Sequence, residues 1–240
     1  MDLSIVIPSF NEGTNVETLS HKIMLAFAEL NITYEILFID DSRDETPLLL
    51  GKLAKEFPQV TYVHRENNRG LGTAVVEGFL RSRADCIIVM DSDLQHPPEL
   101  LPEIFKQLQN YEVVIPSRFI SGGDAGGLNI FRKFVSWGAR VLGQLLVKRL
   151  RHVSDCTGGY FGLRRSVIQN VSLDPIGWKI LIEVLVKGNY TSICELPYAF
   201  HVRDVGDSKM SIKEQWNYLR HIARLMRYKR QDQKVRVVRL

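Results

Sequence analysis

The sequence predicts an α/β protein in which a mostly parallel sheet is covered by helices on both faces. Short apolar segments rich in β-branched residues alternate with helical patterns through the first half of the 240-residue chain. Strands that alternate with helices usually pair in parallel within one sheet. A hydrophobic fraction of 45% and a charged fraction of 24% are enough for one full core. We therefore expect one domain without an internal linker.

The individual elements can be placed from these patterns. The segments with the length and composition of strands are "LSIVIP", "YEILFID", "VTYVH", "CIIVMD", "EVVIPS" and, later, "YTSICELPY". Helical spacing occupies 14–30, 46–57, 70–83 and 98–109 between the first strands, and then 129–150, 176–187 and 211–229. The alternation breaks at the glycine-rich "ISGGDAGGLN". The final "VRVVRL" fits either a strand or a frayed tail.

Cysteine usage and charge limit the compartment and the partners. Cys86, Cys156 and Cys194 form no CxxC pair and follow no signal peptide, so we expect inert free thiols in a cytoplasmic protein. The most apolar long stretch, 131–150, carries too many cations to span a membrane. The net charge is only +4, but "FRKFVSWGARVLGQLLVKRLR" contains no acid. We expect an anionic partner other than a nucleic acid.

Polar residues are concentrated where three of the predicted strands end. Strand one is followed by Pro8, Ser9, Phe10, Asn11 and Glu12, strand two ends in Asp40 and Asp41, and strand four leads into "DSDLQ" at 91–95. In open α/β sheets, ligands bind beyond the carboxyl ends of the strands. The sequence therefore predicts a binding site on this rim of the sheet.

"VMDSDLQHPPEL" (89–100) is the segment of this rim with the strongest chemical signal. Asp91 and Asp93 are two residues apart, so in an extended backbone their side chains leave on the same side. With Gln95 as a neutral third ligand, they form an oxygen-only set suited to Mg²⁺ or Mn²⁺. The spacing alone is equally compatible with a solvated turn before a helix, and His96 is expected to be a turn residue.

"NNRGLGTAVVEG" (67–78) places Gly70 and Gly72 at the opening of a helix. It is not a dinucleotide fingerprint, because Val75 occupies the third glycine position. A helix that opens on glycine can still approach a phosphate or sugar closely through its unpaired N–H groups. A tight loop without a ligand explains the motif equally well.

Taken together, these motifs resemble family 2 glycosyltransferases. The matching segments, in the family's order, are "VIPSFNE", "IDDSRDETP", "NNRGLGTA", "VMDSDLQHPPEL", "IPSRF", "SDCTGGYFGLRRSV", "GWKILIEVLVKG" and "VRDVGDSKMS". The resemblance covers about residues 3–215 and is strongest to the polyprenol-phosphate, dolichol-phosphate mannose synthase-like branch. The sequence departs from the usual pattern at Glu45, where glycine is common, and at Gly158, where serine is common.

The resemblance implies a GT-A-type fold with a Rossmann-like sheet and an enzyme that transfers a hexose with inversion. The implied donor is a nucleotide sugar, GDP-mannose first and UDP-glucose next, and the implied acceptor is a polyprenyl phosphate. The whole chain, 1–240, would be one catalytic domain. Within it, 1–120 would bind the nucleotide sugar, 121–230 would bind the acceptor, and 231–240 would be a tail.

The resemblance also implies roles for individual residues. Pro8, Phe10 and Glu12 would hold the base and ribose, and Asp40 would contact the nucleoside. Asp91, Asp93 and Gln95 would bind Mg²⁺ or Mn²⁺ and the diphosphate. The implied cations are Arg118 near the sugar and phosphates, Arg132 at the acceptor phosphate, and Arg203 and Lys209 closing over the diphosphate.

The chemistry of the acceptor decides whether such an enzyme needs a base. A lipid phosphate has a second pKa of ~6 and is already an anionic nucleophile near neutral pH, so none is required. A family 2 enzyme with a soluble saccharide acceptor would need one, and Asp155 is a candidate. A third possibility is a non-catalytic protein that binds a nucleotide sugar and assists a membrane subunit. A decayed enzyme, however, has little reason to keep the whole set of Asp91, Asp93, Gln95, Arg118 and Arg132.

Two basic amphipathic helices could bring the chain to a lipid. Phe131, Phe134, Val135, Trp137, Val141, Leu142, Leu145 and Leu146 share one face of the first helix; Ile212, Trp216, Leu219, Ala223 and Met226 share one face of the last. Such helices can lie peripherally on the cytosolic face of an anionic membrane. Packing of both apolar faces on the sheet, or docking to a membrane subunit, are the alternatives, and Trp178 and Trp216 are expected to be packing residues.

Overall fold

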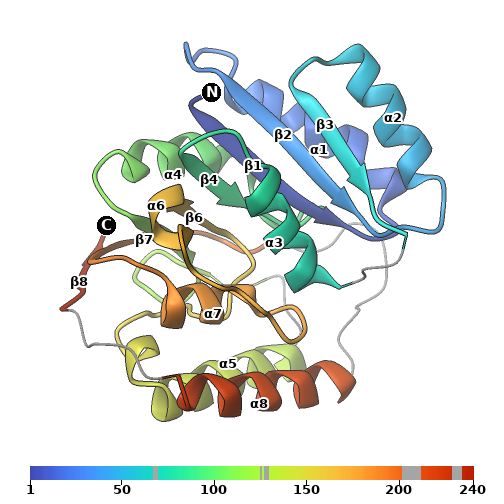
Figure 1. Ribbon diagram of the computed structural model, residues 1–240. Helices are drawn as coiled ribbons and strands as arrows, with labels where there is room; N and C mark the ends of the chain where they lie inside the picture. The colour runs from blue at the N-terminus through green and yellow to red at the C-terminus, as the bar shows by residue number, and fades with distance from the viewer. Residues whose placement is uncertain (67–69, 125, 127–129, 202–211, 229–233) are drawn as a thin grey trace.

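The computed structural model describes residues 1–66, 70–124, 126, 130–201, 212–228 and 234–240, with no description of side chains at 130–134 and 212. Within these residues the strands form one sheet in the order β3-β2-β1-β4-β6-β5-β7-β8 (Figure 1). The strands are β1 (Leu3–Ser9), β2 (Tyr34–Asp40), β3 (Val60–His64), β4 (Cys86–Val89), β5 (Val113–Ser117), β6 (Phe161–Arg164), β7 (Ser192–Pro197) and β8 (Arg236–Arg239). Pairing is parallel except for β6, which runs antiparallel to β4 and β5.

Helices connect the strands and cover both faces of the sheet (Figure 1). They are α1 (Gly13–Ala26), α2 (Thr46–Glu56), α3 (Leu71–Arg81), α4 (Leu101–Leu108), α5 (Ile130–Leu146), α6 (Arg165–Ile168), α7 (Ile180–Lys187) and α8 (Ile212–Met226), with short 3₁₀ turns η1 (Pro98–Leu100) and η2 (Lys148–Leu150). Helices α5 and α8 lie side by side below the sheet, where the Tyr218 hydroxyl of α8 donates a hydrogen bond to the Ala139 carbonyl of α5.

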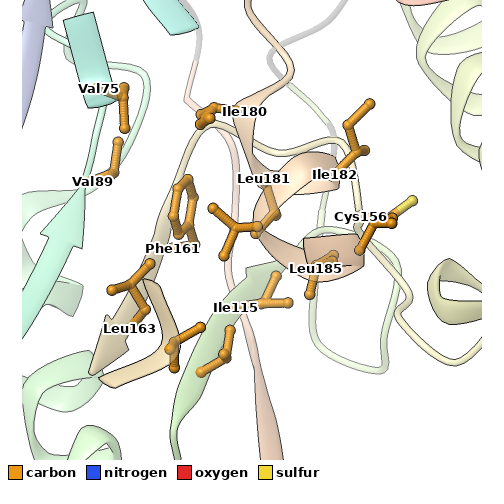
Figure 2. Packing of buried hydrophobic residues seen from close by; sticks show 14 of the residues in the cluster. Val75, Val89, Ile115, Cys156, Phe161, Leu163, Ile180, Leu181, Ile182 and Leu185 are labelled. Carbon is orange, nitrogen blue, oxygen red and sulfur yellow. The ribbon is translucent and has the colours of Figure 1, made fainter. Parts of the chain in front are cut away.

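The sheet separates two apolar cores because successive side chains of each strand point to opposite faces. On β1, Leu3 and Ile5 face one core and Val6 faces the other. Figure 2 shows the second core, in which α7 supplies Leu181 and Leu185 against Phe161 of β6 and the other strands. Burial on both faces explains why the central strands are continuous apolar runs.

The predicted fold class, a mostly parallel sheet with helices on both faces, is confirmed, with differences at several ends. β4 stops at Val89, so Asp91 and Asp93 follow the strand. The argument that an extended backbone directs both side chains to the same side therefore does not apply to them. The antiparallel strand β6 was not predicted. The final "VRVVRL" forms strand β8, parallel to β7. The three cysteines are free and buried, as expected.

In the described part of the chain, no helix is long and apolar enough to cross a membrane.

Candidate active site

A cavity of about 760 Å³ opens at the rim where β1, β4 and β5 end. The loops after these strands supply one side of it. The opposite side comes from the segment before α7 and from one residue of α5, and the first described side chains of α8 complete it. These segments contribute Ser136, Trp178, Lys179, Lys213 and Glu214, and Thr157 joins them from the segment before β6. Chain segments from both halves of the sequence therefore form one pocket.

The ends of β1 and β2 are joined by side-chain hydrogen bonds. Asn11 has a left-handed backbone (φ 53°), which asparagine tolerates better than most residues. Its backbone N–H donates to the Ser42 hydroxyl at 2.7 Å, and its side-chain oxygen accepts from the Arg43 N–H at 2.9 Å. This bracing holds Phe10 and Glu12 in the pocket wall, with the Phe10 ring 40% exposed and able to face a nucleobase.

The two acids that end β2 have different positions. Asp40 is fully buried beneath the rim and accepts hydrogen bonds from Ser9, Ser42 and His64. Asp41 lines the pocket. Asp40 therefore acts in the described structure as an internal anchor, and its assignment as a nucleoside contact stays a prediction.

Asp41 also fixes the start of α3. Its carboxylate accepts from Arg65 Nε and Nη2, both at 2.7 Å, and from the Gly70 backbone N–H at 2.9 Å. Gly70 has φ 134°, a conformation that side-chain-bearing residues rarely adopt. A Cβ on Gly72 would lie 2.4 Å from the Gly177 carbonyl oxygen. The glycines of this motif are thus explained by a tight loop and a close approach, and Gly70 also lines the pocket.

Asp91, Asp93 and Gln95 all line the pocket, although the strand ends before them. Asp93 is buried, and its Oδ1 accepts from the Gln95 N–H at 3.2 Å. The Gln95 Nε2 donates to the His201 carbonyl at 3.0 Å, which leaves Oε1 as the atom suited to ligate a cation. The local turn, with Leu94 at φ 60°, therefore gathers the oxygen set that the sequence predicted.

His96 is more than a turn residue, because it orients Asp91. The Asp91 N–H donates to Nδ1 at 3.2 Å, so Nδ1 is the acceptor and the ring proton lies on Nε2, 3.9 Å from Asp91 Oδ2. The ring is buried and stacks on Tyr160 at 4.9 Å between centroids. Burial lowers the pKa of His96, which keeps the imidazole neutral beside the acids.

A glycine pair on the opposite wall approaches Asp91. A Cβ on Gly159 would come within 2.8 Å of Asp91 Oδ2, so no larger residue fits without displacing this carboxylate. A Cβ on Gly158 would meet nothing closer than 3.6 Å. The position where serine is common among similar sequences therefore has room for one.

Arg118 forms the cationic side of the pocket. It makes a bidentate pair with Asp155, from Nε to Oδ2 at 2.7 Å and from Nη2 to Oδ1 at 3.0 Å. Burial disfavours its charge, but Asp155 outweighs this effect and raises the pKa of Arg118. The guanidinium also lies 5.3 Å from the ring centroids of Phe119 and Phe200. Arg118 is therefore a permanently charged group in a fixed position.

Lys179 adds a second cation that the sequence analysis did not single out. Its ammonium donates to the Thr157 carbonyl at 3.1 Å. Burial, with Arg118 next in importance, lowers the pKa of Lys179 to about 8. The buried Thr157 hydroxyl has no hydrogen-bond partner among the described residues. This part of the wall is thus suited to an anionic or polyhydroxylic ligand.

The structure brings together most of the predicted site. Pro8, Phe10, Glu12, Asp91, Asp93, Gln95 and Arg118 all line the pocket. Arg132 belongs to α5, but its side chain lies outside the described residues, as do Arg203 and Lys209 entirely. The sequence placed Asp41 on the rim without a role, gave no indication of Lys179, and led us to expect Trp178 as a packing residue, whereas all three line the pocket. The feature of the sequence that could have indicated Lys179 is its position directly before the apolar run "ILIEVLV".

The oxygen set fits a hard divalent cation. Among the described residues there is no group of three or more His, Cys, Asp and Glu side chains that could hold a metal ion. The candidate set instead contains the carboxylates of Asp91 and Asp93 and the amide of Gln95. Such a sparse set suits Mg²⁺ or Mn²⁺, which usually keep water ligands and bind substrate phosphates.

Comparison with known proteins places the chain in a family. Residues 4–172 match the description "Glycosyl transferase family 2". The chain belongs to this family. A relative from Pyrococcus furiosus named dolichol-phosphate mannosyltransferase is 40% identical over 95% of this chain, which spans 64% of that relative's length. Relatives with the same name from Saccharomyces cerevisiae and Mycosarcoma maydis are 30% and 32% identical and are covered over 88% and 79% of their lengths.

A solved structure confirms the GT-A-type fold. Glucosyl-3-phosphoglycerate synthase from Mycobacterium tuberculosis, in complex with Mn²⁺, UDP and glucosyl-3-phosphoglycerate, superposes with a TM-score of 0.68. The match covers 94% of this family 2 chain and 78% of the synthase at 17% sequence identity. At that identity the likeness establishes the fold, and it shows that a fold of this type holds Mn²⁺ together with a nucleotide.

Proposed function

We propose that the chain transfers mannose, with inversion, from GDP-mannose to a polyprenyl phosphate. The names of three relatives, one 40% identical to this chain, support the sugar and the acceptor class. The observation that carries the proposal is the bidentate ion pair between Asp155 and Arg118. Both carboxylate oxygens of Asp155 bind Arg118, so the acid named above as a candidate base is already engaged.

The donor would occupy the wall formed by the strand ends. Pro8, Phe10 and Glu12 would contact the base and ribose, with Phe10 stacking on the base. Asp91, Asp93 and Gln95 would hold Mg²⁺ or Mn²⁺, which when bound would neutralise charge on the departing diphosphate. Residues 1–120 would thus supply the donor side and 121–230 most of the acceptor side of one catalytic domain. The donor-side roles of Asp40, Arg203 and Lys209 stay predictions.

The acceptor phosphate would lie against the cationic wall. Arg118 is fixed by Asp155, and Lys179 and Ser136 line the same pocket. Arg132, in the first turn of α5, is the further cation that we assign to the acceptor phosphate. A phosphate dianion attacks the anomeric carbon without giving up a proton, so these residues need only bind it and aim it.

Helices α5 and α8 would bring the chain to the cytosolic face of a membrane. The buried face of α8 carries Tyr218, Ile222 and Leu225. The predicted stripe lies on the outside instead, with Trp216 62%, Leu219 44% and Met226 53% exposed. The alternative in which this stripe packs on the sheet is therefore wrong for these residues, and so is the expectation that Trp216 packs in the core.

The surroundings of the stripe favour an anionic lipid surface. On α5, Trp137 and Leu145 are also exposed. Lys213 and Arg220 are exposed on α8, and Arg227 is exposed directly after it. Apolar side chains flanked by cations suit a peripheral helix on an anionic lipid interface. Because Lys213 also lines the pocket, the same helix would bring the active site close to the lipid.

A transfer assay with two donors tests the proposal. The protein is given labelled GDP-mannose or UDP-glucose, a short polyprenyl phosphate and Mg²⁺ or Mn²⁺, and label in the organic phase is counted. We expect counts with GDP-mannose that disappear on chelation of the metal. Asp93→Ala should abolish them, whereas Asp85→Ala, at the opposite end of β4, should not. Transfer from UDP-glucose instead would contradict the assignment of mannose as the transferred sugar. Transfer without a metal would contradict the proposed metal site at Asp91, Asp93 and Gln95.

A further inference from the structure

A second cavity, of about 390 Å³, lies at the far edge of the sheet from β3 and shares no lining residue with the active-site pocket. It is formed where the segment after α5 meets β7 and the end of the chain around β8. Its apolar lining consists of Val153, Ile193, Val235 and Val237. Strand β8, the segment "VRVVRL" that the proposed function does not use, therefore builds one wall of this cavity.

The polar lining of this cavity is entirely basic. It consists of Lys148, Arg149, His152 and Lys234, and among the described residues no acid lines the cavity. Arg149 is held in place: its Nη1 donates to the Val186 carbonyl at 3.2 Å, and its guanidinium lies 4.8 Å from the centre of the Tyr190 ring. A fixed arginine loses little side-chain entropy when it binds an anion.

The acid closest along this face of β7 does not offset the positive charge. Glu195 follows Ile193 on the same side of the strand and is fully buried. Its Oε2 binds Arg239 Nε of β8 at 2.8 Å, and its Oε1 accepts from the Ser154 N–H at 2.6 Å. The same arginine donates to the His152 carbonyl at 3.0 Å. Glu195 is therefore neutralised inside the fold, and the cavity keeps its positive charge.

We propose that this cavity binds a phosphate-bearing anion at a site separate from the active site. Its cations come from two distant parts of the chain and surround a volume large enough for a phosphate group with an organic substituent. The exposed Leu145 and Leu146 at the end of α5 directly precede the basic segment. A membrane phospholipid headgroup and a free phosphate ester share the required chemistry.

The test uses amide resonances of the full-length protein as local reporters. Shifts of Val153, Val235 and Val237 are followed during titration with inorganic phosphate, soluble short-chain phosphatidylglycerol, or phosphatidylcholine of the same chain length. The double variant Lys148→Gln/Lys234→Gln removes two charges from the cavity. The matched control, Lys52→Gln/Lys55→Gln, removes the same charge from exposed positions on α2.

Saturable shifts at these amides, weakened roughly tenfold or more in the cavity variant but unchanged in the control, would support the site. Saturation by phosphatidylglycerol alone would identify a lipid headgroup, whereas saturation by inorganic phosphate as well would show that a free anion suffices. Gly159 reports anion binding in the active site independently. No saturable shift with any probe, or equal shifts in the cavity variant, would overturn the proposal.

Discussion

Arg118 and Asp155 form a bidentate ion pair at the centre of the site, with Nε–Oδ2 and Nη2–Oδ1 distances of 2.7 and 3.0 Å. Asp155 is fully buried, and the Arg118 side chain is 8% exposed at the pocket wall. The pair turns a flexible cation into a fixed one, and it occupies the carboxylate that a base mechanism would use. Asp155 is therefore a positioning residue in this account.

Asp155→Asn should lower both activity and stability. It leaves Arg118 buried without its counter-charge, which costs about 3 to 5 kcal/mol when a buried pair is broken. Urea unfolding and transfer kinetics on the same preparation check this. Lost turnover with a free energy of unfolding close to that of the wild type would show that the pair does not hold Arg118 in place, and would point to a direct chemical role for Asp155.

Gly159→Ala should inactivate the enzyme while Gly158→Ser is tolerated. The new Cβ at 159 would lie 2.8 Å from Asp91 Oδ2 and displace that carboxylate, whereas at 158 the nearest atom is 3.6 Å away. Metal-dependent transfer by the two variants provides the comparison. Equal activities would show that the position of Asp91 does not limit the reaction.

The pH profile should reflect Lys179 on its alkaline side. The pKa of Lys179 is lowered to about 8, so the ammonium is present below this pH and is lost as pH rises through it. Since the charge favours an anionic acceptor, KM for the lipid phosphate should increase above pH 8. On the acid side, activity should rise as the acceptor loses its second proton near pH ~6.

Variants of this lysine provide the control. Lys179→Arg should extend activity to higher pH, and Lys179→Gln should remove the alkaline limb. Because the unfolded lysine keeps its proton up to pH 10.5, this group also makes the fold more stable as pH rises from about 8 to 10.5. An unchanged alkaline limb in Lys179→Gln would assign it to another group.

Trp216→Ser/Leu219→Ser should weaken binding to anionic vesicles without changing the fold. Both side chains are on the outer face of α8 and contribute apolar area that a lipid interface would cover. Co-sedimentation with vesicles that contain phosphatidylglycerol measures the loss. The control, Leu25→Ser/Leu80→Ser, changes leucines that are 76% exposed on α1 and α3. Equal binding by both double variants would exclude α8 as the membrane contact.

The strand ends of the site could be predicted because they depend on local pattern. The apolar run before Asp91 and the polar residues after it placed these acids on the rim, and the structure agrees. The choice between Asp40 and Asp41 could not be made in the same way. Alternation along the strand does not show which of two adjacent acids is buried. This depends on Ser9 and His64 from other strands and on Ser42 in the loop that follows.

Contacts between distant segments account for the other differences. Lys179 reaches the pocket because the helix predicted from 176 begins only at Ile180, after Gly177 at φ 75°. Helix α8 has two apolar faces. The face with Tyr218 and Ile222 is buried against the core and α5, and the face with Trp216 and Leu219 is exposed. The apolar pattern alone did not decide between them. Strand β6 is short and antiparallel, so the alternation of strands and helices gave no sign of it.

A change of acceptor tests whether the transfer depends on an anionic nucleophile. Under identical conditions with labelled GDP-mannose and Mg²⁺ or Mn²⁺, the protein is offered a polyprenyl phosphate or the polyprenol of the same length, which lacks only the phosphate. We expect a β-linked mannosyl phosphodiester with the first acceptor and no transfer to the second. Comparable transfer to the alcohol would contradict a mechanism that has no base and depends on an anionic nucleophile.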